Sequence, residues 1–150
     1  MSAPLNHAEI AALIPHAGKM CLLDSMQRVS QTDIVCSAVS HHCPDHPLRS
    51  HGRLGASVAV EYAAQAMALH GSILNADFGV PAKGGRLLNV RQLILHCARL
   101  DDFASPLSVR ATRLMGDSAN VIYSFEVSAD VQMIATGRAG VMLVANEGLQ

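Results

Sequence analysis

The order of apolar and polar positions predicts one short helix, one long helix and six strands. Residues 7–14 (HAEIAALI) have the spacing of one or two turns of amphipathic helix, which Pro15 should end. Apolar runs, several of them alternating, predict strands at 20–29, 32–39, 86–100, 105–115, 120–129 and 131–145. Segments rich in proline, glycine and other turn-forming residues at 40–55 and 75–85 are predicted to be loops.

The long helix has the sequence GASVAVEYAAQAMALHG (55–71) and is apolar nearly all round. It is predicted to begin near Gly55 or Ala56 and to end near Gly71, because glycine suits a helix C-cap. A helix that is apolar on every face must be enclosed by other elements. Since it lies between the second and third strands, we expect an α+β fold in which a curled antiparallel sheet of about six strands wraps around one central helix.

Composition indicates a single globular domain over residues 1–150. Half of the 150 residues are hydrophobic and 15% are charged, and this length can bury a substantial core. A net charge of −1 without a long basic run argues against a nucleic-acid partner. No apolar run reaches the roughly 18 residues of a membrane span, and the N-terminus lacks the features of a signal peptide. We therefore expect a soluble, cytoplasmic protein.

Glu61 is the conspicuous charge of the long helix. Gln65 lies four residues later, so the two side chains share one face and can touch. A buried carboxylate without a partner is costly, and a raised pKa that keeps it protonated is the usual relief. A carboxylic acid held neutral near pH 7 can donate a proton, which makes Glu61 a candidate catalytic acid. The alternative is a surface glutamate that reaches solvent or pairs with an arginine such as Arg86 or Arg91.

The loop directly before this helix is rich in histidine. Its first residues, SHHCPDHPLR, contain His41, His42 and His46. Histidine titrates near neutrality and is the commonest general base. A loop that leads into the helix can place one imidazole near Glu61 across a cleft. A basic imidazole facing a neutral acid suits removal of a proton beside a carbonyl and delivery of another to a leaving hydroxyl.

Other interpretations of the histidines stay open. A zinc site is possible in composition, although its spacing matches no standard zinc pattern; its ligands would be His41, Cys43, His46 and His51. The loop histidines are otherwise ordinary polar loop residues. His16, in the segment IPHAGKM, is expected to be structural and to bond nearby backbone. His70 is expected to interact with the dipole at the helix end.

Three segments carry a resemblance to a known family. IPHAGKMCLLD (14–24) is similar to an L-P-H-R-x-P-x-L-L-x-D opening, HCPDHP (42–47) to an H-F-P-x-H-P loop, and the helix 55–71 to P-G-x-x-x-x-E-x-x-A-Q. These are features of the hotdog-fold 3-hydroxyacyl-[acyl carrier protein] dehydratases of fatty acid synthesis. The chain resembles most a divergent branch associated with aryl polyene biosynthesis. The second and third segments together are fairly specific.

The resemblance implies an activity and a set of roles. A 3-hydroxyacyl thioester on an acyl carrier protein or coenzyme A would be dehydrated to the trans-2-enoyl thioester, without a cofactor or metal. Glu61 would be the acid, oriented by Gln65, and His42 or His41 the base; the H-x-P spacing narrowly favours His42. The backbone at the helix start, Gly55 and Ala56, would bind the thioester carbonyl.

The resemblance also implies an oligomer, because the acid and the base of this family come from different subunits. We expect a homodimer or larger homo-oligomer, or a hetero-oligomer with a related dehydratase. The chain departs from the family in having Leu54 before Gly55 and several extra residues around 49–53. Two alternatives therefore stand beside the dehydratase: a thioesterase of the same fold, which would use Glu61 and a water, and a non-catalytic subunit that partners an active dehydratase.

Overall fold

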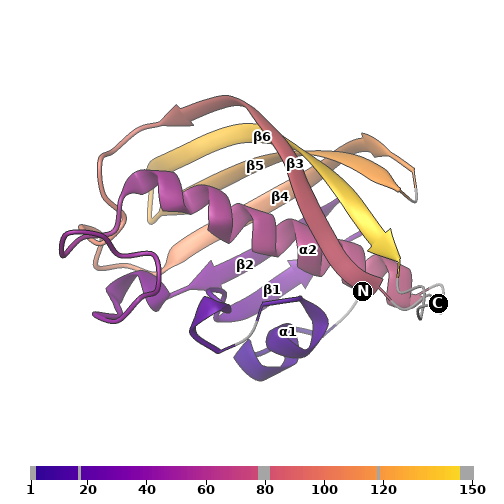
Figure 1. Ribbon diagram of the computed structural model, residues 1–150, viewed down its shortest axis with the longest axis horizontal. Coiled ribbons are helices and arrows are strands. Elements are labelled where there is room, and N and C mark those ends of the chain that lie inside the picture. Colours follow the sequence, from indigo (N-terminus) through magenta and orange to yellow (C-terminus); the bar gives the residue numbers. More distant parts are fainter. Residues whose placement is uncertain (1–2, 17, 78–81, 118, 146–150) are drawn as a thin grey trace.

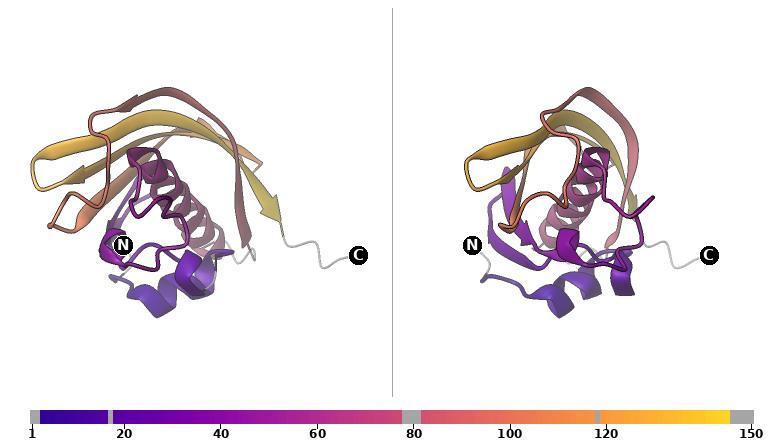
Figure 2. Two further views of the ribbon diagram at one scale, coloured as in Figure 1. Left: turned by 60° about the vertical axis from the view of Figure 1, so that its left-hand side comes forward. Right: turned by 90° about the vertical axis from the view of Figure 1, so that its left-hand side faces the viewer.

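The computed structural model describes residues 3–16, 18–77, 82–117 and 119–145. One sheet curls over the long helix α2 (Ala59–Asp77), and the short helix α1 (His7–Leu13) lies on the side of α2 that the sheet leaves open (Figures 1 and 2). The strands are β1 (Ser25–Val29), β2 (Asp33–Ala38), β3 (Ala82–Leu95), β4 (Leu107–Gly116), β5 (Asn120–Ala129) and β6 (Gln132–Ala145). This confirms the expected α+β architecture.

The sheet has six antiparallel strands in the order β1-β2-β4-β5-β6-β3. In β5 the buried positions alternate with more exposed ones; the buried residues are Val121, Tyr123, Phe125, Val127 and Ala129. This period of two places one face of the strand against α2. Helix α2 packs against strands β2 to β6, and its Ala59, Ala63 and Ala66 are completely buried. Small side chains let the helix lie close to the concave face of the sheet.

Both predicted helices exist, but the predicted end of the long one is wrong. A 3₁₀ turn at Ala56–Val58 leads into α2, which passes through Gly71 and continues to Asp77. Beyond Gly71, Ser72 is buried and its hydroxyl donates to the Leu13 carbonyl oxygen at 2.8 Å. Glycine inside a helix costs only about 1 kcal/mol, and tertiary packing of the following turn outweighs it. In the loop expected at 75–85, residues 75–77 belong to α2 and 82–85 to β3, while residues 78–81 lie outside the described residues.

The predicted strands differ from the observed ones mainly at their ends. The run 20–29 forms a strand only from Ser25, because Gly18–Met20 is a 3₁₀ turn and the backbone of Met20 and Leu22 bonds a helix side chain. The run 86–100 forms β3 from Ala82 to Leu95. Tertiary contacts, which the local pattern does not contain, decided both boundaries.

Strand β3 is an edge strand with apolar side chains exposed on both faces. Consecutive residues 93, 94 and 95 are all exposed, at 39, 53 and 41%. Leu87 and Leu88, nearer the start of the strand, are exposed as well. An edge strand with unpaired backbone groups and apolar flanks is a surface to which another strand can add.

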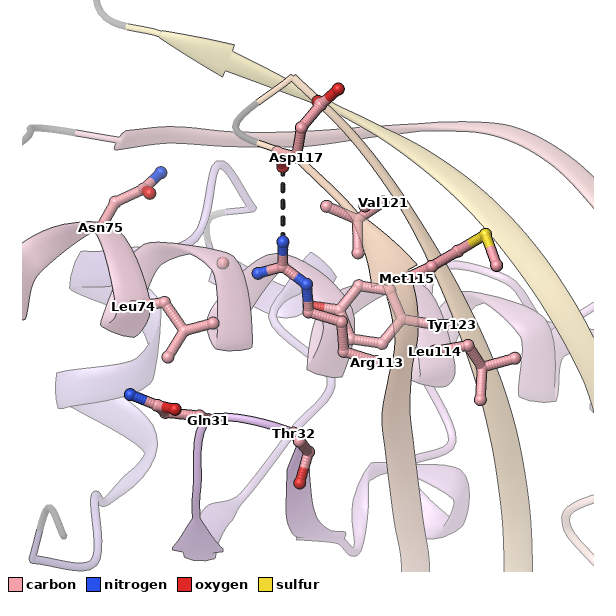
Figure 3. A pocket seen from close by; sticks show the side chains of 12 residues that line it. Gln31, Thr32, Leu74, Asn75, Arg113, Leu114, Met115, Asp117, Val121 and Tyr123 are labelled. Carbon is pink, nitrogen blue, oxygen red and sulfur yellow. Dashed lines mark hydrogen bonds between the residues drawn. The ribbon is translucent and has the colours of Figure 1, made fainter.

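Beyond the middle of α2 a pocket opens between the helix, the β1–β2 turn and strands β4 and β5 (Figure 3). It lies at the other end of α2 from Glu61. Within the part of the chain that the structure describes, no helix has the length and apolarity needed to cross a membrane.

Candidate active site

Glu61 and Gln65 lie on one face of the first turns of α2, as their spacing predicts. Gln65 is completely buried. Its side-chain oxygen accepts the Leu22 N–H at 2.8 Å, and its nitrogen donates to the Met20 carbonyl at 2.6 Å and to Glu61 Oε2 at 3.4 Å. Because the Leu22 N–H can only donate and the Met20 carbonyl can only accept, the amide orientation is set, and Gln65 presents a donor to the Glu61 carboxylate.

His16 is the imidazole that contacts Glu61 in this chain. Its Nε2 lies 3.0 Å from Glu61 Oε2, and the two side chains are 24% and 32% exposed. The burial assumed in the argument for a neutral acid is therefore only partial: 32% of the Glu61 side chain is exposed. The partner is an imidazole rather than an arginine; the Arg86 side chain lies outside the described residues.

The interpretation of His16 as a purely structural residue was incomplete, because His16 contacts Glu61. It lies in the segment between α1 and β1, which packs against the start of α2 through Gln65. Its Nδ1 is buried and has no hydrogen-bond partner among the described residues. The signal in the sequence was the position of His16 inside the first family-like segment, but the distance to Glu61 required the fold.

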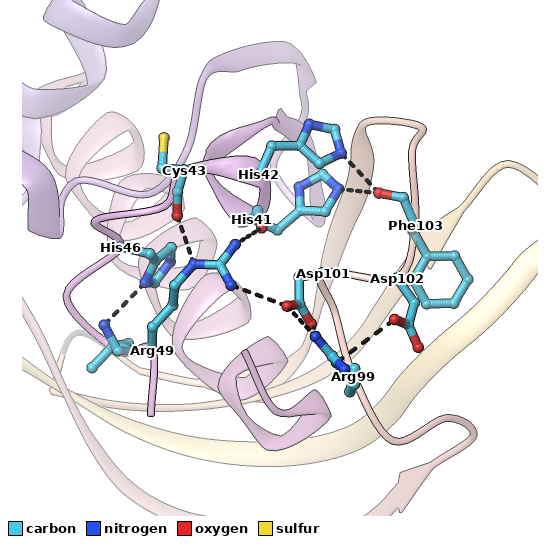
Figure 4. A network of polar contacts seen from close by, with 10 residues as sticks. His41, His42, Cys43, His46, Arg49, Arg99, Asp101, Asp102 and Phe103 are labelled. Atoms are coloured by element: carbon cyan, nitrogen blue, oxygen red, sulfur yellow. Dashed lines mark hydrogen bonds and ion pairs between the residues drawn. The ribbon is translucent and has the colours of Figure 1, made fainter. Parts of the chain in front are cut away.

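The loop histidines form a second cluster, shown in Figure 4. His41 Nε2 lies 3.0 Å from the carbonyl oxygens of both Phe103 and Ser105, and His42 Nε2 lies 2.8 Å from that of Phe103. A carbonyl only accepts, so each Nε2 carries the proton and donates. In the neutral imidazoles Nδ1 is then the basic nitrogen.

The two loop imidazoles differ in access. His41 is completely buried, and its Nδ1 has no partner among the described residues, whereas His42 is exposed. Burial, followed by the neighbouring His42, lowers the pKa of His41 below its usual value. His41 is therefore a neutral imidazole at pH 7, and His42 is the one that a substrate can reach in the isolated chain.

An ion-pair network holds this loop in place. Arg49 donates to the carbonyls of His41 and Cys43 and to Asp101, at 3.1, 2.7 and 3.0 Å. Asp101 also accepts two bonds from Arg99, at 2.9 and 2.7 Å. These bonds, that from Arg99 first, hold the pKa of the Asp101 carboxyl well below its usual range. The network ties the histidine loop to the segment after β3 (Figure 4).

Gly55 and Ala56, the two predicted substrate-binding residues, differ in whether their backbone N–H group already has a hydrogen-bond acceptor. The Ala56 N–H donates to the Ala98 carbonyl at 2.9 Å, while Leu54 accepts from the Leu100 N–H at 2.8 Å. Gly55 pairs with Arg99 between these two bonds, and its own N–H has no backbone acceptor among the described residues. Gly55 is therefore the residue with a free donor for a carbonyl oxygen.

Among the described residues of one chain, the contacts of Glu61 do not include the predicted base. In the described residues, no hydrogen bond or ion pair joins Glu61 to His41 or His42; Glu61 contacts His16 and Gln65 instead. His46 is buried between the Leu48 N–H at 3.0 Å and the Tyr62 hydroxyl at 3.1 Å, which is a structural role. Nor does the described part of the chain contain a group of three or more His, Cys, Asp or Glu side chains placed to hold a metal ion.

His70 is not at a helix end, so the expected dipole interaction is wrong. It lies inside α2 and is completely buried. Its Nε2 is 2.8 Å from the Ser30 carbonyl and its Nδ1 2.7 Å from the Tyr123 hydroxyl. Because the carbonyl requires a donor, Nε2 carries the proton and Nδ1 accepts from Tyr123. Burial lowers the pKa of His70, and the ring is neutral at pH 7.

Comparison with known proteins adds family and fold. The family model described as ApeP-like, ApeP dehydratase, matches residues 8–148. The dehydratase heterocomplex ApeI:P from Xenorhabdus doucetiae is similar in structure, with 22% identity, a TM-score of 0.81 and 91% of each chain covered.

Two further solved structures share the fold at lower similarity. AziG from S. sahachiroi has 13% identity and a TM-score of 0.61, over 82% of this chain and 91% of that one. Thioesterase HI1161 from Haemophilus influenzae has 14% identity and a TM-score of 0.60, over 85% and 82%. These neighbours bear out the predicted hotdog fold. A search of curated proteins found no significant match.

Proposed function

This chain belongs to the ApeP-like dehydratase family, and from that premise we propose that it dehydrates a 3-hydroxyacyl thioester on an acyl carrier protein to the trans-2-enoyl thioester. The pathway would be fatty acid or polyene-type biosynthesis. The observation that carries the proposal is the partly exposed Glu61 carboxylate, oriented by the buried Gln65 and within 3.0 Å of an imidazole. No cofactor or metal enters the reaction.

The reaction needs one base, one acid and one donor for the thioester oxygen. The Nδ1 lone pair of His42 takes the proton from C2, and the electrons of that C–H bond form the C2–C3 double bond. Glu61, in its protonated form, gives its proton to the hydroxyl on C3, which leaves as water. The free Gly55 N–H stabilises the negative charge that develops on the thioester oxygen.

His16 gives the acid a route to recover its proton. After one turnover Glu61 is ionised and His42 is protonated. The His16 Nε2, 3.0 Å from Glu61 Oε2, can pass a proton from solvent to the carboxylate, because the His16 side chain is 24% exposed. Gln65 keeps the carboxylate facing His16 and the substrate, and does not change charge.

We propose that the loop histidine is supplied by a second subunit. Within one chain, among the described residues, His42 bonds the Phe103 carbonyl oxygen and Glu61 contacts His16. The edge strand β3, exposed and apolar on both faces, is the surface on which such a subunit would pair. The second subunit is either another copy of this chain or a related dehydratase; the similarity to a heterocomplex supports the latter.

A second candidate function is that of a subunit that stabilises an active dehydratase without performing the chemistry. The same two observations favour it: the similar heterocomplex, and the lack, among the described residues of one chain, of a hydrogen bond or ion pair between Glu61 and the loop histidines. Hydrolysis of a thioester is the third possibility, since a thioesterase shares the fold.

Turnover separates these functions. The purified chain, alone and with a co-expressed related dehydratase, is incubated with a 3-hydroxyacyl carrier protein, and the products are followed by intact mass spectrometry. Loss of one water supports dehydration, whereas release of the carrier thiol with a free acid supports hydrolysis. If Glu61→Gln leaves the activity of the complex unchanged, the chain is a non-catalytic partner.

A further inference from the structure

The pocket beyond the middle of α2 contains a cationic group that the proposed dehydration does not use. Its volume is about 540 Å³, within the usual range of small-molecule sites. It is lined by Arg113 of β4, by Leu74 and Asn75 of α2, and by Val121 and Tyr123 of β5. Thirteen residues of helix separate Leu74 from Glu61, which is about 20 Å at 1.5 Å per residue. The pocket is therefore a second, separate cavity.

The Arg113 guanidinium has little to bond in the described structure. Its one hydrogen bond is from Nη2 to the Asp117 backbone oxygen, at 3.5 Å, which is the limit of a hydrogen bond. Figure 3 shows the Asp117 carboxylate pointing away from the guanidinium. That carboxylate accepts the N–H groups of Ala119 and Asn120 at 2.8 and 2.9 Å. Among the described residues no carboxylate forms an ion pair with Arg113.

The pocket lining contains one other charged group, the Asp117 carboxylate, whose pKa is lowered by the backbone N–H groups of Asn120 and Ala119. Tyr123 donates to His70, and burial keeps the pKa of Tyr123 high and that of His70 low. The nearby Asp33 is bonded to Arg110 at 2.9 Å. Apart from Arg113 and Asp117 the residues that line the pocket are neutral, and its apolar walls include Leu74, Val121 and Met115.

We propose that this pocket binds an amphipathic carboxylate, in which one carboxylate is joined to an apolar chain. Arg113 would hold the carboxylate through its two parallel N–H groups, a geometry that guanidinium and carboxylate share. The amide of Asn75, which has no hydrogen-bond partner among the described residues, lies on the same wall. The apolar chain would lie along Leu74, Val121 and Met115. A thioester lacks the free carboxylate, so the ligand is a free acid and not the dehydration substrate.

Isothermal titration with octanoate tests the proposal on the full chain. We expect saturable binding with one site per chain, and binding at least about tenfold weaker for Arg113→Gln, which keeps the size and loses the charge. Arg110→Gln is the matched control, because Arg110 lies on the same strand but bonds Asp33 outside the pocket; it should bind octanoate as the wild type does. 1-Octanol, with the same chain and no charge, should bind at least about tenfold more weakly.

A second variant keeps the arginine and fills the cavity. Leu74→Trp should abolish octanoate binding while thermal melting shows a folded protein. Three results overturn the proposal: no saturable octanoate binding to the wild type, equal affinity for 1-octanol, or unchanged affinity in either folded variant. If Arg113→Gln does not fold, the comparison with 1-octanol and the Leu74→Trp variant test the proposal instead. None of these measurements involves turnover, so their failure leaves the proposed dehydration untouched.

Discussion

The two halves of α2 each lie against a histidine that contacts a hydroxyl or carboxyl group, with opposite consequences. His16, near the start of the helix, contacts Glu61 through Nε2 and is partly exposed. His70, in the second half, is completely buried, with both ring nitrogens bonded to Ser30 and Tyr123. A ring with both nitrogens occupied cannot exchange a proton with substrate or solvent. A histidine alone therefore does not identify a catalytic region. What distinguishes the Glu61 region of the helix is that its histidine is partly exposed and, among the described residues, not hydrogen-bonded through both ring nitrogens.

The largest effect should come from removing the acid. Glu61→Gln keeps the shape and the contacts to Gln65 and His16 but cannot donate a proton, so we expect kcat to fall about 10²- to 10⁴-fold. Formation of the enoyl thioester, by mass spectrometry or ultraviolet absorbance, measures it. Glu126→Gln, an exposed carboxylate on β5, is the control and should keep wild-type activity. Activity in Glu61→Gln close to that of the wild type would remove this end of the helix from the chemistry.

Mixing two inactive variants tests whether the acid and base come from different subunits. If this chain forms an active homodimer, Glu61→Gln and His42→Ala should each be inactive. Random reassembly of equal amounts should then restore about one quarter of wild-type activity, because half of the dimers are hybrids with one intact site of two. Reassembly after mild denaturation, followed by the turnover assay, gives the fraction. No recovery from verified hybrids would place both groups in one subunit.

A smaller effect is expected at His16, which returns a proton rather than starting the reaction. His16→Ala should lower kcat about tenfold with little change in KM. Added imidazole should restore part of the rate, which a purely structural role would not allow. His51→Ala, in the exposed histidine of the loop, is the control and should respond to neither change. Failure of imidazole to rescue a folded His16→Ala would make His16 a packing residue.

At His70, in the second half of the helix, the effect should be on stability alone. His70→Gln should lower the free energy of unfolding by about 1–3 kcal/mol, because Tyr123 and Ser30 lose a well-placed partner, and should leave kcat unchanged. Thermal melting and the turnover assay measure the two quantities. A loss of catalysis in folded His70→Gln would contradict a purely structural role for His70.

His70 should also make the stability of the fold weakly dependent on pH. Burial lowers the pKa of His70, and also of His41 and His46, so the unfolded chain binds protons more tightly than the folded one. The stability that these residues contribute is present above about pH 6.5, the ordinary histidine pKa, and is lost as the pH falls below it. In denaturant titrations between pH 7.5 and about pH 5, His70→Gln should show a shallower decline than the wild type. Parallel curves would contradict the assignment.

The architecture could be predicted from local patterns because it depends on them. Period-two alternation in β5 and an all-apolar helix leave few ways to bury both, and a sheet curled around the helix is the simplest. The Glu61–Gln65 pair was predictable for the same reason, since residues four apart on a helix meet. The acid–base hypothesis came from Glu61 and the loop histidines themselves; the family-like segments added the dehydratase activity and favoured His42 over His41 only narrowly.

What the sequence determined by itself was therefore the order of elements, the enclosed helix and the shared face of Glu61 and Gln65, because each depends on near neighbours in the chain. Only the tertiary structure decided that His16 contacts Glu61, that His70 is sealed against Tyr123, and that Arg113 faces a pocket. The two histidine contacts join residues 45 or more positions apart in the sequence. The pocket beside Arg113 is formed by residues of α2, β4 and β5 and of the β1–β2 turn. Such distances are set by the packing of the whole core, which no local pattern encodes.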